Sequence, residues 1–298
     1  MPQSAKPRPL HVDGGSFDEY YFRHCCGRPY GFDEHWTAFF GRIADVIVRD
    51  IRPRRVLDAG CAMGILVQAL RERGVEAWGV DLSPYAISRC PEAVRPYCRV
   101  GSIADAFDAR FDLICCIEVV EHMPASEGER AIANLCAHAG DVLFSSSPDD
   151  FTEPTHINVQ PAEYWARLFA QHGFYRDTAF SAECVAPWAV RLRHSHAPFP
   201  AIVGDYERGL AGLHRANVEL RASLLDAQRR LAAAERRLEE TETTLGRQID
   251  DLRAHVAALE PAAARADEAS REYERAMGTI RNMERSVFWK ARRWFGRR

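Results

Sequence analysis

Short apolar runs alternate with amphipathic stretches over the first two thirds of the chain. The runs have the length of buried strands, whereas the stretches between them place apolar residues at helical spacing. The expected strands are 55–58, 77–81, 97–101, 111–118, 141–145, 174–180 and 186–192, and the expected helices are 35–51, 65–73, 84–89, 126–137 and 162–172. This alternation predicts an α/β fold over residues 17–200, with a doubly wound, mostly parallel seven-stranded sheet covered by helices on both faces.

A different pattern begins beyond Pro200. A second apolar series starts at Leu213, three positions after the first, and becomes polar toward its end. The first series, in steps of seven, is Leu210, Asn217, Leu224, Leu231, Leu238, Leu245, Leu252 and Leu259. This heptad pattern predicts a long C-terminal coiled-coil helix over 204–260, and with it a homo-oligomer; the alternative is one solvated helix without a partner. Pro261 is expected to interrupt the helix and to leave a second helical stretch at 261–284.

The two ends of the chain have compositions of their own. Residues 1–16 are polar with Pro and Gly, so we expect a disordered N-terminus. Residues 285–298 carry six basic side chains and no acid, and their apolar residues share one helical face. This basic amphipathic tail predicts either a helix on an anionic membrane surface or a helix end that packs against the coil or a partner.

Composition narrows the class of protein. The net charge of −3 has no basic excess, so we expect no nucleic-acid partner. The nine cysteines are an odd number without metal-ligand spacing, which is typical of reduced thiols in a cytoplasmic protein. We find no signal peptide and no run of apolar residues long enough to span a membrane. The expected location is therefore cytoplasmic, with peripheral attachment to the inner face of the cytoplasmic membrane if the tail binds lipid.

The stretch VLDAGCAMGIL at residues 56–66 predicts a strand, a tight glycine turn and the start of a helix. Gly60 and Gly64 remove side chains where the backbone must come close to a ligand. Asp58 stands where a dinucleotide-binding loop has its first glycine, and its carboxylate would repel a pyrophosphate. Asp81 ends the next expected strand, where a carboxylate can accept hydrogen bonds from ribose hydroxyls. The loop therefore favours a cationic, phosphate-free cofactor.

With these features the chain resembles the class I S-adenosylmethionine-dependent methyltransferases, which have a Rossmann-like fold. Ala62 departs from the usual loop, in which a glycine stands. FDLICCIEVVEHMP at 111–124 is similar to the fourth strand of the family and the loop after it, and YCRVGSIADAF at 97–107 to the third strand and the loop beside the adenine. The resemblance implies S-adenosylmethionine as cofactor, held by Asp58, Ala59, Gly60, Cys61, Gly64, Asp81, Leu82, Ser102, Ile103, Glu118 and Val119. Asp105 is a second candidate for the adenine contact expected of Ser102.

Two histidines are candidates for the chemistry. Methyl transfer is an in-line displacement, and a base assists when the acceptor is a hydroxyl. His156 lies in a long loop after the fifth expected strand, and His122 in the loop after the fourth. We expect His156 to serve as base or to hold the acceptor, with His122 as the other catalytic candidate; the alternative is a structural hydrogen-bonding role.

Glu118, Glu121 and His122 form an E-x-x-E-H group. It is similar to a pattern that binds divalent metal in ubiquinone-pathway O-methyltransferases and in small-RNA 3′-end methyltransferases. Family members that bind no metal carry it as well. We expect no metal, and keep as the alternative a site made of Glu118, Glu121, His122 and His156.

The acceptor is predicted from whole-segment similarity. The loop after the fifth strand, the heptads and the Arg/Trp-rich end together resemble methyltransferases associated with bacterial glycosyltransferases and surface polysaccharides. This resemblance implies O-methylation of a sugar hydroxyl of a glycan or glycolipid, with a glycosyltransferase as a candidate partner. The alternatives are a small-molecule or quinone-type O-methyltransferase and a coiled-coil scaffold with a vestigial methyltransferase domain.

Overall fold

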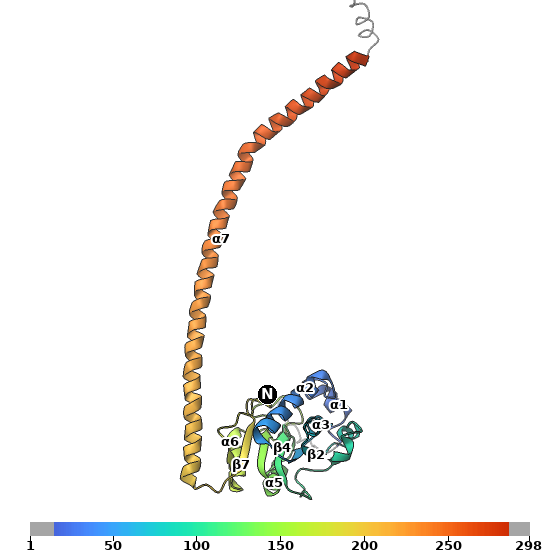
Figure 1. Ribbon diagram of the computed structural model, residues 1–298, viewed down its shortest axis with the longest axis vertical. Helices are drawn as coiled ribbons and strands as arrows, with labels where there is room; N and C mark the ends of the chain where they lie inside the picture. Colours follow the sequence, from blue (N-terminus) through green and yellow to red (C-terminus); the bar gives the residue numbers. More distant parts are fainter. Residues whose placement is uncertain (1–14, 286–298) are drawn as a thin grey trace, which may run out of the picture. The chain divides into compact units, whose positions relative to one another are not determined.

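Seven strands form one sheet in the computed structural model, which describes residues 15–285 (Figure 1). The strands lie in the order β3-β2-β1-β4-β5-β7-β6. Their bounds are Arg55–Ala59 (β1), Glu76–Asp81 (β2), Cys98–Val100 (β3), Phe111–Ile117 (β4), Ala139–Ser145 (β5), Phe174–Arg176 (β6) and Val190–His194 (β7). The first five are parallel to one another, and β7 runs antiparallel to both of its neighbours. The expected seven-stranded, mostly parallel sheet is confirmed, and its strand order reverses between β1 and β4, where such sheets bind ligands.

Helices connect the strands. Their bounds are Glu19–His24 (α1), Glu34–Val46 (α2), Ile65–Glu72 (α3), Pro84–Ser88 (α4), Ala125–His138 (α5), Ala162–Gln171 (α6) and Phe199–Arg285 (α7), with short turns of helix at Ile47–Ile51 (η1), Arg95–Tyr97 (η2) and Val120–His122 (η3). The side chains of Asp18 and Asp33 accept hydrogen bonds from the first backbone N–H groups of α1 and α2. These N-caps explain why both helices begin where they do.

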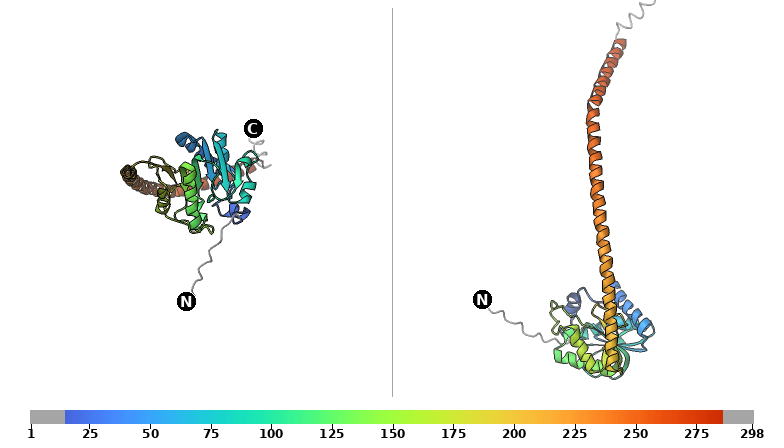
Figure 2. Two further views of the ribbon diagram at one scale, coloured as in Figure 1. Left: turned by 90° about the horizontal axis from the view of Figure 1, so that it is seen from below. Right: turned by 90° about the vertical axis from the view of Figure 1, so that its left-hand side faces the viewer.

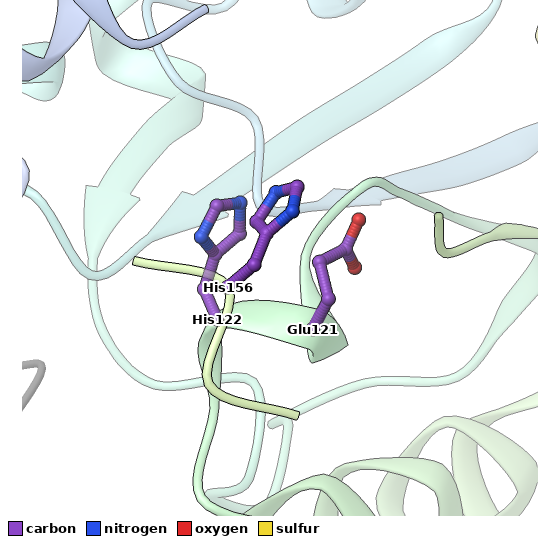
Figure 3. Close-up of side chains that lie close together, drawn as sticks. All are labelled: Glu121, His122 and His156. Carbon is purple, nitrogen blue, oxygen red and sulfur yellow. The ribbon is translucent and has the colours of Figure 1, made fainter. Parts of the chain in front are cut away.

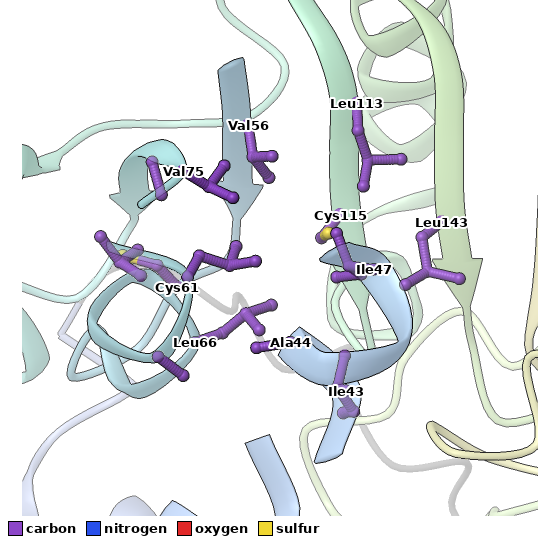
Figure 4. Packing of buried hydrophobic residues seen from close by; sticks show 14 of the residues in the cluster. Ile43, Ala44, Ile47, Val56, Cys61, Leu66, Val75, Leu113, Cys115 and Leu143 are labelled. Atoms are coloured by element: carbon purple, nitrogen blue, oxygen red, sulfur yellow. The ribbon is translucent and has the colours of Figure 1, made fainter. Parts of the chain in front are cut away.

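Two apolar clusters cover the two faces of the sheet. Helices α2 and α3 pack on one face, where Leu66 of α3 belongs to the same buried cluster as Leu113 and Leu143 of the sheet (Figure 4). Helices α5 and α6 cover the other face, to which Ile114 and Val142 point. Adjacent residues of β4 and β5 thus enter opposite clusters, which is why both strands read as continuous apolar runs. The doubly wound arrangement is confirmed.

The last two strands differ from the expected 174–180 and 186–192. They span only 174–176 and 190–194, because the segment between them leaves the sheet. Its apolar side chains at Ala182, Val185 and Ala189 are buried in the cluster that α2 and α3 form. The apolar residues between β6 and β7 therefore indicate a loop that is buried against the sheet, and not longer strands.

The C-terminal helix α7 is continuous over 87 residues and contains Pro261 (Figure 2). The expected interruption at Pro261, and with it a separate helix at 261–284, is wrong. A proline removes one backbone hydrogen bond and bends a helix without having to end it. Figure 1 shows the ribbon change direction in its orange-red part. The coiled coil that we expect over 204–260 requires a second helix and stays a prediction.

Several expectations concern the ends of the chain. Residues 1–14 and 286–298 lie outside the described residues, and so do nearly all of the expected disordered N-terminus and basic tail. Gly15 and Ser16, from the segment expected to be disordered, lie in a turn before α1. By contact the chain divides into two units, Met1–His214 and Arg215–Arg298. Across residues 15–285, no helix is both long and apolar enough to cross a membrane.

Candidate functional site

A cavity of about 700 Å³ lies at the carboxyl ends of the central strands. Nine of the eleven residues expected to hold the cofactor line it: Asp58, Gly60, Cys61, Asp81, Leu82, Ser102, Ile103, Glu118 and Val119. Both catalytic candidates, His122 and His156, line the same cavity. The fold therefore brings the cofactor residues and the candidate base into one chamber.

The glycine turn after β1 packs directly against the loop after β4. Gly60 has a φ of +93°, and a Cβ built on it would lie 2.3 Å from a methyl carbon of Val119. Its backbone N–H donates to the carbonyl of Val80 at 2.7 Å. Ala62, which replaces the usual glycine, also has a positive φ of 48°. The turn thus requires glycine at position 60 both for its backbone conformation and for close packing.

Ala59 and Gly64, the other two residues of the expected cofactor set, are not among the residues that line the cavity. Ala59 is fully buried within the sheet. Gly64 precedes α3 with a φ of +78°, and a Cβ there would meet Cys98 Sγ at 3.0 Å and Val94 at 3.2 Å. Both residues therefore support the turn through packing, and Gly64 also through its left-handed backbone at the start of α3.

Asp81 ends β2 with its carboxylate held by backbone donors. Oδ2 accepts from the N–H of Ala62 at 2.7 Å, and Oδ1 from the N–H of Ser83 at 2.8 Å. Burial raises the pKa of Asp81, while these two hydrogen bonds lower it. Each carboxylate oxygen has lone pairs left for a further donor. Asp81 therefore fixes the glycine turn and can still accept from both ribose hydroxyls.

Asp58 is 5 % exposed, and it lies near a second carboxyl group. Burial, and then the charge of Asp81, raise the pKa of Asp58 to about 8. A buried carboxyl in this state favours a cation, because a positive charge nearby restores its ionised form. The ammonium and sulfonium groups of S-adenosylmethionine would supply such a charge.

Ser102 and Asp105 both lie in the cavity wall beyond β3. The Ser102 hydroxyl accepts from the N–H of Ala104 at 3.1 Å, and Asp105 lies 3.7 Å from Arg130 in an exposed ion pair. Ser102 thereby stabilises its own loop and keeps its hydroxyl proton for another acceptor. Both residues remain candidates for the adenine contact.

Glu118 occupies a left-handed backbone conformation, with a φ of 53°, directly after β4. Its N–H donates to the carbonyl of Ser145 at 3.1 Å, and its Oε1 accepts from the indole N–H of Trp188 at 2.9 Å. Sequence analysis missed Trp188, because no motif surrounds it and 70 positions separate the two residues. The contact positions the Glu118 carboxylate at the cofactor end of the cavity.

Hydrogen bonds around His122 determine its tautomer. The Thr155 hydroxyl donates to Glu153 Oε2 at 2.5 Å, so it can only accept from His122 Nδ1 at 2.8 Å. The neutral ring therefore carries its proton on Nδ1, and Nε2 faces the hydroxyl of Tyr21 at 3.4 Å. Burial, followed by the nearby His156, lowers the pKa of His122 to about 3. His122 thus stays neutral and is linked to Glu153 by two hydrogen bonds that share the Thr155 hydroxyl.

His156 carries its ring proton on the same nitrogen as His122, but its other nitrogen faces a carboxylate. Its Nδ1 lies 2.9 Å from the carbonyl oxygen of Asp150, which can only accept, so the ring proton is on Nδ1. Nε2 keeps its lone pair and lies 3.7 Å from Glu153 Oε2. Two acceptors at this distance attract a proton donor between them. Glu153 is therefore a site residue that sequence analysis missed, because its role depends on this loop folding back on itself.

Glu121, His122 and His156 form the one candidate metal cluster in the described part of the chain (Figure 3). One ligand atom from each lies within 4.8 Å of the others. Glu121 is fully buried; burial and then the charge of Glu118 raise its pKa well above the usual range. Three of the four residues of the alternative metal set thus come together, whereas the fourth, Glu118, accepts from Trp188.

Aromatic side chains from the N-terminal segment form the other wall of the cavity. They are Phe17, Tyr21, Phe22, Tyr30, Trp36, Phe39 and Phe40. The ring of Phe17 meets His122 edge-on at 5.5 Å, and the backbone carbonyl of Phe17 accepts from the Ser83 hydroxyl at 2.5 Å. This segment therefore covers His122 and links it to the loop that follows Asp81.

The fold and site together define the class of this domain. Residues 32–178 match the family described as methyltransferase domain. The sheet order, the glycine turn and the acid at the end of β2 agree with that match. This part of the chain is a class I S-adenosylmethionine-dependent methyltransferase domain, and its cofactor is S-adenosylmethionine.

Curated relatives carry one recurring name. The chain is 33 % identical over 153 residues to a ubiquinone biosynthesis O-methyltransferase of Xylella fastidiosa, covering 47 % of this chain and 59 % of that protein. It is 33 % identical over 102 residues to the protein of the same name from Alkalilimnicola ehrlichii, covering 31 % and 41 %. The chain thus spans about half the length of the curated relatives it matches.

Solved structures with similar folds include magnesium protoporphyrin IX methyltransferase from Synechocystis with bound SAH. It is 16 % identical, with a TM-score of 0.47, over 61 % of this chain and all of that one. A methyltransferase from Archaeoglobus fulgidus is 23 % identical, with a TM-score of 0.42, over 53 % and 73 %.

Proposed function

We propose that this protein transfers the methyl group of S-adenosylmethionine to a hydroxyl group of a small aromatic molecule. The observation that carries the proposal is the single cavity, in which the Asp81 end adjoins a chamber with His156, Glu153 and an aromatic wall. The printed name of the curated relatives, ubiquinone biosynthesis O-methyltransferase, supports a quinone-type acceptor. The expected glycan acceptor has no support among these relatives, and the small-molecule alternative takes its place.

The chain's own residues would position both reactants. Asp58 and Asp81 would hold the cationic and ribose parts of the cofactor at one end of the cavity, next to the chamber that would take the acceptor. The aromatic wall, including Tyr21 and Phe22, excludes water and offers flat apolar surfaces for a ring. Holding the acceptor oxygen in line with the methyl carbon supplies much of the rate enhancement.

His156 is the base in this proposal. Its Nε2 lone pair and the Glu153 carboxylate both attract the proton of an acceptor hydroxyl. As the oxygen attacks, the proton moves to Nε2, and the resulting imidazolium is stabilised by Glu153 on one side and the Asp150 carbonyl on the other. His122 is unsuited to this role, since a pKa of about 3 makes it a weak base.

A divalent cation is the second candidate for activating the hydroxyl. The cluster of Glu121, His122 and His156 fits such an ion by donor type, and Glu121 Oε2 is buried without a hydrogen-bond partner among the described residues. When bound, the ion would stabilise the oxyanion of the acceptor. If it acts here, a chelator abolishes turnover and Mg²⁺ restores it; turnover that withstands chelation supports His156 alone.

The proposal is tested with the full-length protein, S-adenosylmethionine and two acceptor sets, hydroxylated benzenes with apolar chains and sugars with free hydroxyls. We expect S-adenosylhomocysteine, together with a mass gain of one CH₂ unit, only with the aromatic set. Methylation of sugars alone would restore the glycan reading. Cofactor binding without turnover of either set would favour the scaffold alternative.

His156→Ala is the sharpest variant for the mechanism. We expect kcat to fall by roughly 10²- to 10⁴-fold, while the affinity for S-adenosylmethionine stays unchanged, because the base acts on the acceptor alone. His172→Ala, an exposed histidine after α6, is the matched control. An equal loss in both variants, or a loss of cofactor affinity in His156→Ala, would contradict the assignment.

A further inference from the structure

Helix α7 carries a stripe of regularly spaced leucines that nothing in the described residues covers. The leucines at the first heptad position, together with Leu213 and Leu220, are between 51 and 69 % exposed. Residues seven apart lie on one face of a helix, so these side chains form one seam. An apolar seam of this length is far larger than the patches that monomeric proteins leave in water, and it therefore indicates an interaction surface.

We propose that a second copy of this chain covers the seam, as a parallel, in-register, two-stranded coiled coil over 210–259. The charges beside the seam select this partner. Arg230 and Arg237 stand at the position before a leucine of the first series (g), and Glu235 and Glu242 at the position after the second series (e). In a parallel pair, each g residue faces the e residue of the next heptad on the other helix. Arg230 then faces Glu235 of the second copy, and Arg237 faces Glu242.

The antiparallel alternative reverses these signs. Its flanking contacts join g with g and e with e, so Arg230 and Arg237 would face arginine and Glu235 and Glu242 would face glutamate when the central heptads overlap. Like charges side by side disfavour that arrangement.

Asn217 supports the same direction. It occupies the first-series position, and in a parallel pair such residues face their own copies across the seam. The two amides can then hydrogen-bond to each other, since each has a donor and an acceptor. In an antiparallel pair Asn217 would face a second-series residue, so the two amides would not meet. A lone buried Asn at this position is also the device that fixes register in two-stranded coils.

The first experiment measures the mass of the full chain in solution by sedimentation equilibrium. We expect twice the chain mass of 33.7 kDa. The double variant R230E/R237E places glutamate against glutamate and should weaken the dimer by roughly tenfold or more. E235R/E242R should weaken it equally, and an equimolar mixture of the two should restore a dimer. The matched control is R229E/R236E, with the same charge change one position away, on the outer face of the helix.

A mass of one chain at micromolar concentration, or of three or four chains, would overturn the proposal. So would an equal loss of dimer in R229E/R236E, because this would show that net charge, and not the flanking pairs, governs assembly. Binding of S-adenosylmethionine by each variant verifies that the catalytic unit is folded.

The second experiment tests direction. Asn217→Cys and Leu259→Cys are made separately in the full chain and treated with oxidised glutathione. All native cysteines lie between residues 25 and 184, so the untreated seam contains none, and the unmodified protein is the control. A parallel, in-register pair forms an interchain disulfide at both positions. Cross-linking at only one position, or at neither, would exclude this arrangement, because the ends of an antiparallel seam are far from their own copies.

Discussion

At the scale of single residues, the site contains several buried carboxyl groups that form no ion pair with a basic side chain among residues 15–285. Asp58 and Asp81 lie together at the cofactor end, and Glu121 is buried close to His122 and His156. Burial raises the pKa of each of them. Such groups destabilise the empty pocket when ionised and are relieved by a cation. The buried carboxyl groups therefore make the pocket favour a positively charged ligand, independently of any single hydrogen bond to it.

This electrostatic preference predicts proton release on cofactor binding. The Asp58 carboxyl, with a pKa of about 8, is mostly protonated at neutral pH, and the cationic cofactor lowers that pKa. Affinity should therefore rise with pH, by up to roughly tenfold per pH unit, and level off near the pKa of the free pocket. Calorimetry in two buffers of different ionisation enthalpy measures the protons released.

Asp58→Asn is the control for this linkage. It should bind the cofactor more weakly and release no proton through this group. Without ligand, it should be more stable than the native protein at neutral pH. A carboxyl with a raised folded-state pKa gives its full stability below the unfolded value of 3.8 and loses it as pH rises toward about 8. The stability difference between the two proteins should thus vanish near pH 4. Proton uptake by the native protein would contradict the assignment.

At the scale of elements, the glycine turn and the loop after β4 act as one unit. Gly60 touches Val119, and Glu118 beside it is held by Trp188 and Ser145. Because both loops follow central strands of a parallel sheet, they meet at the same edge. The cofactor end of the cavity is thus set by the contact between two loops and not by either loop alone.

Gly60→Ala tests this contact against a matched glycine. Gly60 and Gly74 both have a positive φ, of 93° and 81°, but a Cβ at Gly74 would meet nothing within 4 Å. Gly74→Ala should cost about 1 kcal/mol of unfolding free energy through backbone strain alone. Gly60→Ala should cost a further ~1–3 kcal/mol through overpacking against Val119, and should weaken cofactor binding. Urea unfolding measures the loss of unfolding free energy in each variant. Equal losses would mean that the two loops can move apart to admit the Gly60→Ala methyl group at no cost.

At the scale of the whole molecule, the chain consists of two units with different sources of stability. The unit Met1–His214 contains the buried apolar clusters, whereas the described part of Arg215–Arg298, up to Arg285, is helix whose leucines are exposed. The first unit has a core of its own. The second has no interior, so its stability depends on what covers the seam.

We therefore expect two thermal transitions. Cofactor at 100 times its Kd should stabilise the catalytic unit by ~2.7 kcal/mol, which raises its Tm by roughly 5–10 °C and leaves the helix transition in place. Raising the protein concentration should shift only the helix transition, since dimers melt in a concentration-dependent way. Circular dichroism follows the helices of both units, and tryptophan fluorescence chiefly follows the catalytic unit, which holds four of the six tryptophans. One transition that responds to both changes would contradict the independence of the two units.

The sequence by itself determined the repeating features of this protein. Apolar period and length located the central strands, and the acids at the ends of β1 and β2 indicated a cationic cofactor, because these signals are local properties of the chain. Tertiary structure alone decided which side chains meet. It placed Gly64 and Ala59 behind the turn, joined Glu118 to Trp188, and linked His122 to Glu153 through Thr155. It also carried α7 through Pro261, where the hydrogen bonds of the surrounding helix outweigh one missing donor. Such contacts depend on where distant segments cross, and no periodicity along the chain encodes that.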